Sequence, residues 1–212
     1  MERLSPLASP SATRAVLEAH GLSTKYSLGQ NFLVNDAILR KIVALAELSP
    51  EDEVLEIGPG IGTLTVALLK CAGRVASVER DALDLAAADL PFSPTKLVAN
   101  LPYAVAATVV LDCFERFSGL ESATVMVQKE VADRMAADPG SKNYGAYTVK
   151  LRLYAEPAGR FAVGPGNFFP PPRVESAVVR LDRRPLRDSA GDPLDARALR
   201  AACIMADAAF AT

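Results

Sequence analysis

The alternation of apolar and polar positions along the chain predicts short buried strands separated by amphipathic helices. Apolar runs rich in branched side chains predict strands at Val54–Ile57, Arg74–Glu79, Lys96–Asn100 and Ala123–Gln128. Apolar residues three and four positions apart predict helices at Ser11–His20, Asp36–Leu48, Ala104–Phe117 and Lys129–Ala137. Strands that alternate with helices in this way are typical of an α/β fold with a parallel sheet.

The last third of the chain departs from this alternation. Gly159–Val163 and Ser176–Leu181 are predicted to be strands and antiparallel neighbours, whereas Ala146–Tyr154 fits a strand or a helix. From Asp182 to Asp192 the composition shifts to Arg, Asp, Pro and Gly, which indicates a linker before a helix at Asp195–Phe210. One helix cannot bury an apolar face alone, so we expect a longer helical part to follow.

Three glycines at alternate positions end the first strand, at Gly58, Gly60 and Gly62. Glycine adopts positive φ and has no Cβ, so the backbone can turn sharply and approach a ligand. Thr63 is expected to cap the helix that follows. The strand, the glycine turn and the start of the helix together predict a nucleotide-binding corner. The alternative is an ordinary glycine turn between a strand and a helix. The spacing differs from G-x-G-x-x-G, and Glu56 brings a carboxylate that suits an ammonium group better than a phosphate.

A second acid, Glu79, ends the next strand. It lies about 20 residues after the glycines, where a carboxylate holds ribose hydroxyls in nucleotide-binding sheets. A solvated strand-end carboxylate is the alternative. A glycine turn flanked by Glu56 and Glu79 suggests S-adenosylmethionine, which carries an amine, a sulfonium and a ribose diol.

The stretch from Glu79 to Lys96 is short for a doubly wound fold. Each crossover between parallel strands takes a dozen residues or more, and a helix, a strand and another helix are usual here. Either the crossover is abbreviated or residues are absent close to Arg80–Asp81. We favour absent residues.

The strand Lys96–Asn100 continues directly into Leu101-Pro102-Tyr103. Pro102 makes the turn rigid, while Asn100, the Leu101 carbonyl and the Tyr103 ring meet at the carboxyl edge of the sheet, where open α/β sheets bind ligands. Two acceptors beside an aromatic face suit a planar group with an exocyclic amine. An ordinary strand-to-helix turn explains Pro102 but not Asn100 and Tyr103 together.

Two loops also carry candidate binding residues. Lys25–Leu33 fits neither helix nor strand, so its polar Gln30 and Asn31 indicate a loop that closes over a ligand or plugs the core. Asn167–Arg173 is a stiff proline run that presents Phe168 beside a second Phe. Two exposed Phe side chains are unfavourable unless they pack or bind a planar group.

Composition narrows the class of protein. The 212 residues, half of them hydrophobic, fit one domain with a small appendage. Cys71, Cys113 and Cys203 form no C-x-x-C pair, which argues against a disulfide framework or a zinc site and indicates a reducing, cytoplasmic compartment. No apolar run approaches the length of a membrane span, and no signal-peptide pattern opens the chain. The net charge of −2 gives no indication of nucleic acid.

Five motifs, in this order, resemble those of the KsgA family of ribosomal RNA adenine dimethyltransferases. They are Q-N-F-L at Gln30–Leu33, E-I-G-P-G-I-G at Glu56–Gly62, N-L-P-Y at Asn100–Tyr103, V-Q-K-E-V-A-D-R-M at Val127–Met135 and F-F-P-P-P-R-V-E-S at Phe168–Ser176. The resemblance covers roughly residues 25–182. A G-x-G-x-G alone is weak evidence, but the five motifs together are strong.

The resemblance implies a Rossmann-like class I S-adenosylmethionine-dependent methyltransferase that acts without a metal on two adjacent adenines of small-subunit rRNA. The catalytic domain would occupy residues 1–182, and residues 183–212 would be a linker and the start of a small C-terminal helical domain. Immature 30S subunits are the implied partner, and we expect a monomer.

The resemblance also assigns site residues. Those implied to bind the donor are Gln30, Asn31, Leu33, Glu56, Gly58, Gly60, Glu79, Asp81, Ala82 and Asn100. Those implied to hold the target adenine are Asn100, Leu101, Tyr103 and Phe168.

Three other functions stay open. The sister group that methylates large-subunit rRNA and confers macrolide resistance shares the corner and a similar turn, but the F-F-P-P-P and Q-K-E-V-A-D-R-M runs favour the small-subunit group. A DNA adenine methylase is less favoured, because such enzymes carry an acid and two prolines at the N-L-P-Y position. The protein could also be mainly a ribosome-assembly factor.

Four arginines cluster where the main domain passes into the linker, namely Arg180, Arg183, Arg184 and Arg187. They are candidates for RNA phosphate contacts, and a solvated, partner-free cluster is the equal alternative.

Overall fold

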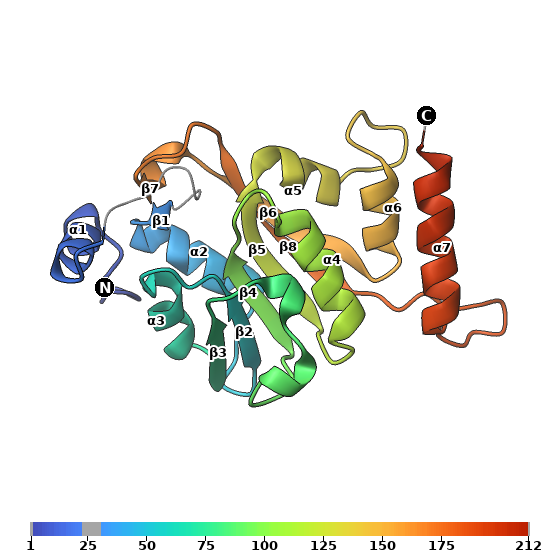
Figure 1. Ribbon diagram of the computed structural model, residues 1–212, viewed down its shortest axis with the longest axis horizontal. Coiled ribbons are helices and arrows are strands. Elements are labelled where there is room, and N and C mark those ends of the chain that lie inside the picture. Colours follow the sequence, from blue (N-terminus) through green and yellow to red (C-terminus); the bar gives the residue numbers. More distant parts are fainter. Residues whose placement is uncertain (1, 23–30, 212) are drawn as a thin grey trace.

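The computed structural model describes residues 2–22 and 31–211 and contains a central six-stranded sheet with helices on both faces (Figure 1). The strand order is β3-β2-β4-β5-β8-β6. Four neighbouring strands are parallel, namely β3 (Arg74–Val78), β2 (Glu53–Ile57), β4 (Lys96–Asn100) and β5 (Ser122–Gln128). The α/β fold and these four predicted strands are confirmed.

The two late strands reverse direction at the other edge of the sheet. β8 (Ser176–Arg183) pairs antiparallel with both β5 and β6 (Ala155–Val163). The predicted antiparallel pair is therefore confirmed, with both strands longer than expected. The segment that fitted either a strand or a helix is the helix α6 (Ala146–Arg152).

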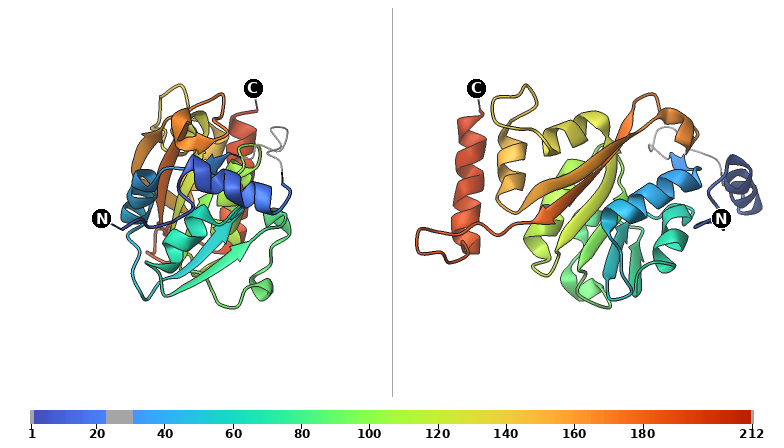
Figure 2. Two further views of the ribbon diagram at one scale, coloured as in Figure 1. Left: turned by 90° about the vertical axis from the view of Figure 1, so that its left-hand side faces the viewer. Right: turned by 180° about the vertical axis from the view of Figure 1, so that it is seen from behind.

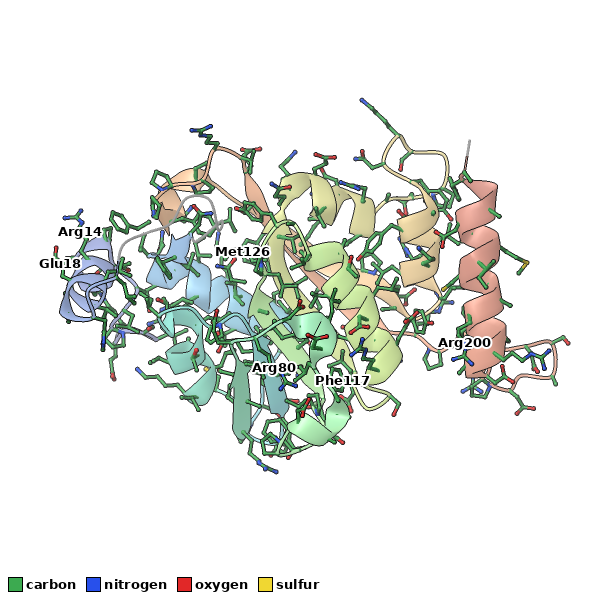
Figure 3. The ribbon with its side chains drawn as sticks, viewed as in Figure 1. Arg14, Glu18, Arg80, Phe117, Met126 and Arg200 are labelled. Carbon is green, nitrogen blue, oxygen red and sulfur yellow. The ribbon has the colours of Figure 1, made fainter. Side chains whose placement is uncertain are left out.

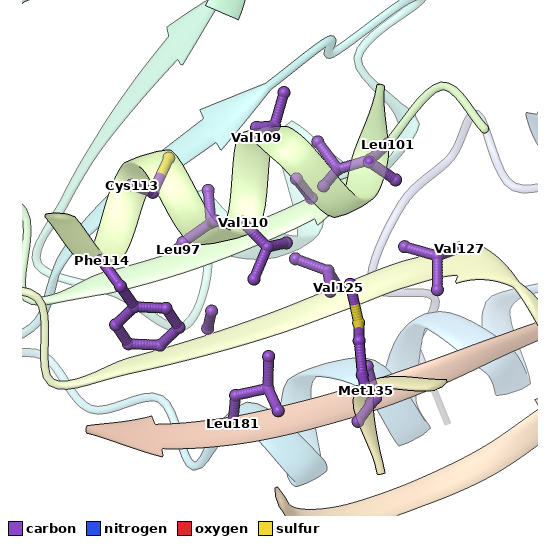
Figure 4. Close-up of a cluster of buried hydrophobic side chains, with 14 of the residues drawn as sticks. Leu97, Leu101, Val109, Val110, Cys113, Phe114, Val125, Val127, Met135 and Leu181 are labelled. Carbon is purple, nitrogen blue, oxygen red and sulfur yellow. The ribbon is translucent and has the colours of Figure 1, made fainter. Parts of the chain in front are cut away.

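The helices cover both faces of the sheet because successive strand side chains point to opposite sides. On one face, Leu55, Leu97 and Val125 share a core with α4 (Ala106–Arg116), which Figure 4 shows in part. On the other face, their neighbours Val54, Val98 and Met126 share a core with α2 (Asp36–Ala46). This alternation along each strand explains why the predicted strands read as almost continuous apolar runs.

The remaining helices are α1 (Pro10–Ala19), α3 (Thr63–Leu69), α5 (Lys129–Met135) and α7 (Ala196–Ala209). Side chains cap the first two long helices, since Ser9 Oγ accepts from the Ala12 amide and Asn35 Oδ1 accepts from the Ala37 amide. The prediction that Thr63 caps its helix is wrong. Gly62, with φ of 82°, occupies the cap position without a side-chain bond, and Thr63 is the first helical residue.

The crossover from β3 to β4 is abbreviated and continuous. Two short 3-10 helices, η2 (Ala82–Asp84) and η3 (Ala87–Asp89), take the place of a full helix, and the Asp84 amide donates to the Asp81 carbonyl. Leu85 lies between them, only 2% exposed, in the core under α4. In this chain Leu85 and its apolar neighbours cover this part of the sheet. The expected absence of residues near Arg80–Asp81 stays a prediction.

The far end of the crossover is fastened to the edge strand. Arg74 on β3 stacks over the Phe92 ring at 4.5 Å and donates to the Pro91 carbonyl at 3.2 Å. The same guanidinium forms an ion pair with Glu53 at 2.7 Å. One arginine thus ties the returning chain to two neighbouring strands.

The helices α1 and α7 lie at opposite ends of the molecule (Figures 1 and 2), and the labelled Arg14 and Arg200 mark these ends in Figure 3. α7 packs against α6, with Leu199 and Cys203 on the core side. Its Ile204 and Met205 are 69% and 66% exposed. The boundary expected at residues 182 and 183 stays a prediction, although β8 extends to Arg183 and so carries the sheet just across it.

Each of the four clustered arginines has a partner in the described structure, and Arg184 and Arg187 are also exposed to solvent. Arg180 forms ion pairs with Glu47 at 2.6 Å and Asp182 at 2.7 Å. Arg183 donates to the carbonyls of three residues that follow or end α4, Phe114, Phe117 and Leu120. Arg184 pairs with Glu156, and Arg187 donates to the Gly191 carbonyl. These side chains fasten β8 and the following segment to the domain. The RNA contact that the sequence suggested stays a prediction.

The abbreviated crossover makes Leu85 a sensitive position. Leu85→Ala leaves a cavity in the core under α4, so we expect a loss of about 2–5 kcal/mol in the free energy of unfolding. Leu69→Ala is the matched control, since Leu69 is 60% exposed and its truncation should change stability by about 0.5 kcal/mol or less. Denaturant unfolding of the two variants measures both values, and equal losses would contradict the role given to Leu85.

Candidate functional site

A pocket of about 280 Å³ lies where β2 and β4 end at the carboxyl edge of the sheet. This volume is close to the lower end of small-molecule sites, roughly 300 Å³. The predicted site residues that line it are Asn31, Leu33, Glu56, Gly58, Gly60, Glu79, Asn100, Leu101 and Tyr103. The structure therefore brings together residues from three separate motifs of the sequence and Glu79 at the end of β3.

The glycine corner forms one wall of the pocket. Gly58, Gly60 and Gly62 all have positive φ, at 70°, 56° and 82°. The Gly58 amide donates to the Val78 carbonyl at 2.9 Å, so the turn is fastened to β3 as it leaves the sheet. A Cβ on Gly60 would lie 3.1 Å from Cε1 of Phe32. Glycine is needed here both for its backbone conformation and because an aromatic ring packs against it.

Two carboxylates face this corner. Glu56 is 1% exposed, and its Oε2 accepts from Thr65 Oγ1 and Ser77 Oγ, each at 2.6 Å. Burial raises the pKa of Glu56, the two hydroxyl bonds oppose that rise, and the charge of Glu79 adds to it. Glu79 is more exposed, and its Oε2 accepts from the Gly60 amide at 3.3 Å. Among the described residues that line the pocket, none is basic.

The N-L-P-Y turn forms the opposite wall. The Leu101 amide donates to the Met126 carbonyl, and the Pro102 carbonyl accepts from Val105 and Ala106 as α4 begins. Asn100 Nδ2 donates to the Asn31 carbonyl at 3.4 Å, which leaves Oδ1 as the acceptor end of that amide. The turn is thus fixed to β5 on one side and to the loop before β1 on the other.

Tyr103 is anchored at its hydroxyl. Its OH and Ser176 Oγ are 2.7 Å apart, and Ser176, the first residue of β8, is fully buried. Burial raises the pKa of the Tyr103 hydroxyl more than the Ser176 bond lowers it, so the phenol stays neutral. A neutral phenol held at its tip presents a fixed ring beside Asn100.

A small two-stranded sheet supports the side of the pocket formed by Phe32 and Leu33. β1 (Phe32–Leu33) pairs antiparallel with β7 (Phe168–Phe169), which follows the 3-10 helix η4 (Pro165–Asn167). The Val34 amide donates to the Asn167 carbonyl at 2.8 Å, and Asn35 Nδ2 donates to Asn167 Oδ1 at 2.7 Å. The two loops that the sequence singled out therefore support each other.

The structure does not bring every predicted residue to the pocket. Phe168 is 4% exposed and lies in the core with α2, because its neighbour Phe169 takes the outward position in β7 and stacks under Arg14. Asp81 and Ala82 belong to the abbreviated crossover and are not part of the pocket lining; the Asp81 carboxylate accepts from the Leu83 amide. Gln30 lies outside the described residues.

Some residues that line the pocket were not predicted to do so, among them Phe32, Thr63 and Pro102. Phe32 was present in the Q-N-F-L motif, and its large side chain beside Gly60 was the available signal. Thr63 Oγ1 is buried and has no partner in the described part of the chain. A buried, unpartnered hydroxyl in a pocket wall is free to bond a ligand.

Two further candidate features are not found in the described ranges. No group of three or more His, Cys, Asp or Glu side chains is arranged to hold a metal ion, and the three cysteines are free thiols. None of the helices there is long and apolar enough to cross a membrane.

The sheet, its glycine corner and the acidic pocket at the strand ends define a Rossmann-like class I methyltransferase. Two solved structures agree with this class. A dimethyladenosine transferase from Plasmodium falciparum has a TM-score of 0.64 and 28% identity, covering 72% of this chain and 63% of its own. The 23S rRNA methyltransferase ErmE has a TM-score of 0.66 and 27% identity, covering 85% of this chain and 79% of its own.

The family model of ribosomal RNA adenine dimethylase matches residues 21–89 and 88–192, so this chain belongs to that family. The two matched stretches meet inside η3, in the abbreviated crossover. Among curated relatives, the ribosomal RNA small subunit methyltransferase A of Acidothermus cellulolyticus is 44% identical over an alignment of 198 positions, which covers 81% of this chain and 68% of the relative. The resemblance noted in the sequence is confirmed.

The bond between Tyr103 and Ser176 joins the N-L-P-Y turn to β8 and can be measured by itself. Tyr103→Phe leaves the Ser176 hydroxyl buried without its partner, so we expect a loss of about 1–3 kcal/mol in unfolding free energy. Ser176→Ala should lose a similar amount, and the double variant should lose less than the sum by about 1 kcal/mol. Denaturant unfolding of all three variants gives this coupling. Strictly additive losses would mean that the bond does not stabilise the turn.

Proposed function

We propose that this chain transfers methyl groups from S-adenosylmethionine to N6 of two adjacent adenines in small-subunit rRNA. The observation that carries the proposal is the meeting of Asn100 and Tyr103 with an acidic glycine corner in one pocket, in a member of the ribosomal RNA adenine dimethylase family. The family and its methyltransferase fold support the reaction class, and the curated relatives are named for the small subunit.

The residues present fit the donor. Two carboxylates and no basic side chain among the described lining residues favour a ligand with positive charges. Glu79 would take the ribose hydroxyls, and the glycine corner permits close approach of the ligand to the backbone. Gln30, Asn31 and Leu33 would surround the methionine end, as the family resemblance implies. When bound, the donor supplies a methyl group on a sulfonium, which is already a good leaving group.

The target amine would lie between Asn100 and Tyr103. An adenine N6 lone pair is delocalised into the ring and is a weak nucleophile. If Asn100 Oδ1 and the Leu101 carbonyl accept its two N–H bonds, the nitrogen is drawn toward tetrahedral geometry and its lone pair is freed. Positioning and preorganised dipoles then lower the barrier without a strong base.

Tyr103 would provide the aromatic ring that stacks on the target adenine. Stacking on one aromatic ring stabilises an extracted base by about 1–3 kcal/mol. Phe168, which the resemblance placed opposite, lies in the core and would have to move to take part. The proposal therefore rests on Tyr103 for stacking, with its ring held in place through Ser176.

The other functions are less well supported. The large-subunit activity has a solved relative of similar fold, but the identity of that structure is 27% against 44% for a curated small-subunit relative. An assembly factor without catalysis would have no need of a complete donor pocket beside the N-L-P-Y turn. Immature 30S particles remain the proposed partner, encountered by a monomer in the cytoplasm.

The donor half of the proposal is tested at Glu79. Glu79→Ala leaves the ribose hydroxyls without a charged acceptor, so S-adenosylmethionine binding should weaken by about 1–3 kcal/mol. Calorimetric titration measures the dissociation constant, with Glu18→Ala, on exposed α1, as the charge-matched control. Unchanged affinity in folded Glu79→Ala would remove Glu79 from the donor site.

The target half is tested at Asn100. Asn100→Ala removes one hydrogen-bond acceptor that the amine would use in the transition state. Turnover on immature 30S particles should therefore fall by about 10²- to 10⁴-fold. Each factor of ten corresponds to about 1.4 kcal/mol of barrier. The binding of donor and particle should stay within a few fold. Asn143→Ala, in an exposed loop, is the matched control.

Methyl incorporation and mapping of the modified nucleotides read out this experiment. Turnover near the wild-type value in Asn100→Ala would show that the proposed amine contact is wrong. A wild-type protein that binds particles and never methylates them would favour the assembly-factor function.

A further inference from the structure

Glu56 is a carboxylate at the end of β2 with an unusual arrangement of partners. It is 1% exposed, yet it lines the pocket. Its Oε2 accepts two hydroxyl bonds of 2.6 Å, from Thr65 on α3 and from Ser77 on β3. Both donors reach the same oxygen from two different elements, which leaves the lone pairs of Oε1 for another partner.

The lengths of these two bonds are those of hydroxyl groups that donate to a carboxylate. Hydrogen bonds from a hydroxyl to a carboxylate oxygen are about 2.5–2.7 Å long, shorter than those between neutral groups. Two such donors favour the charged form of Glu56 against the cost of burial, which is the larger effect and raises its pKa. The bonds therefore act on the charge of the group as well as on its orientation.

The surroundings of Glu56 offer no compensating positive charge within the described pocket. From β3 it faces Ser77 and the carboxylate of Glu79, from α3 the uncharged Thr63 and Thr65, and from β4 the uncharged Asn100. Glu79 is the charged neighbour and opposes ionisation. A positive ligand is the group that this arrangement lacks.

We infer that Thr65 and Ser77 are positioning residues that hold Glu56 as an oriented anion, with Oε1 left to interact with the positive charge of the donor. This inference rests on the proposed function, because it assumes that S-adenosylmethionine occupies the pocket. It adds that donor binding is linked to the protonation of Glu56. The Thr65 and Ser77 hydroxyls would set the pH at which protonation begins to weaken donor binding.

The direction of the pH effect follows from comparing Glu56 in the free protein with Glu56 in the donor complex. Without ligand, burial and Glu79 raise the pKa of Glu56. A bound cation favours the ionised form and lowers that pKa, so binding releases a proton and weakens as the pH falls toward the raised pKa. Removing either hydroxyl raises the pKa of the free protein further. The affinity of the variant should then fall at a higher pH than that of the wild type.

The experiment is calorimetric titration of the full chain with S-adenosylmethionine from about pH 5 to about pH 8.5, a range that begins just above the ordinary pKa of Glu. The variants are Thr65→Val, which removes the hydroxyl at constant shape, and Ser77→Ala. Repeating each titration in buffers of different ionisation enthalpy gives the number of protons released. Thr108→Val is the matched control, because Thr108 is an exposed residue of α4.

We expect Thr65→Val and Ser77→Ala to bind about tenfold more weakly than the wild type at the acid end, the effect of a pKa shift of about one unit. They should bind nearly as well as the wild type at the alkaline end. Thr65→Ser, which keeps the hydroxyl, should restore the wild-type profile. Glu56→Gln should remove the part of the proton release that is due to Glu56.

Three outcomes overturn the inference or its basis, and they differ from one another. Failure of the folded wild type to bind S-adenosylmethionine at any pH refutes the proposed donor. Wild-type binding with the same pH profile in both hydroxyl variants refutes the linkage. An equal loss of affinity at every pH means that the hydroxyls have only a structural role. If Thr65→Val does not fold, as circular dichroism would show, Ser77→Ala and Glu56→Gln still decide the question.

Discussion

The backbone turns sharply away from the sheet directly after the buried carboxylate of Glu56, at the end of β2. Most of the pocket depends on this turn. Glu56 lies in the last residues of the strand, and Gly58, Gly60 and Gly62 then carry the backbone through positive φ. Any side chain at Gly60 would strain the backbone and press on Phe32. The turn therefore fixes the position of the carboxylate, the start of α3 and the ring that lies over the corner.

Contacts between distant parts of the chain complete what this turn begins. β7 holds β1 over the corner, and Ser176 holds Tyr103 beside Asn100. Asn100 in turn reaches the carbonyl of Asn31. The proposed donor half and the proposed target half of the pocket thus share a wall, so a displacement in the loop before β1 would change both. This arrangement suits a reaction in which two substrates have to meet in line.

The crossover from β3 to β4 contains two short 3-10 helices instead of the α-helix that usually connects parallel strands. A crossover helix normally covers the sheet between such strands, and here Leu85 with its apolar neighbours fills the same core. β3 lies at the edge of the sheet, and Asp81 lies outside the pocket lining. The arginines near the C-terminal end tie β8 and the segment that follows it to their surroundings.

Local pattern determined much of this protein. The strands, most helices, the glycine corner, its two acids and the N-L-P-Y turn were all predictable, because each depends on spacing and residue type within a short stretch. Tertiary structure alone decided the outcome at Phe168, Thr63, Ala146–Arg152 and the arginine cluster. Which of two adjacent phenylalanines faces the core depends on pairing with β1, more than a hundred residues away. Whether an arginine is free depends on carboxylates and carbonyls that only folding brings within reach. Short-range signals carry no information about such partners, which is the physical reason that the pocket lining was predicted more accurately than the contacts that hold it in place.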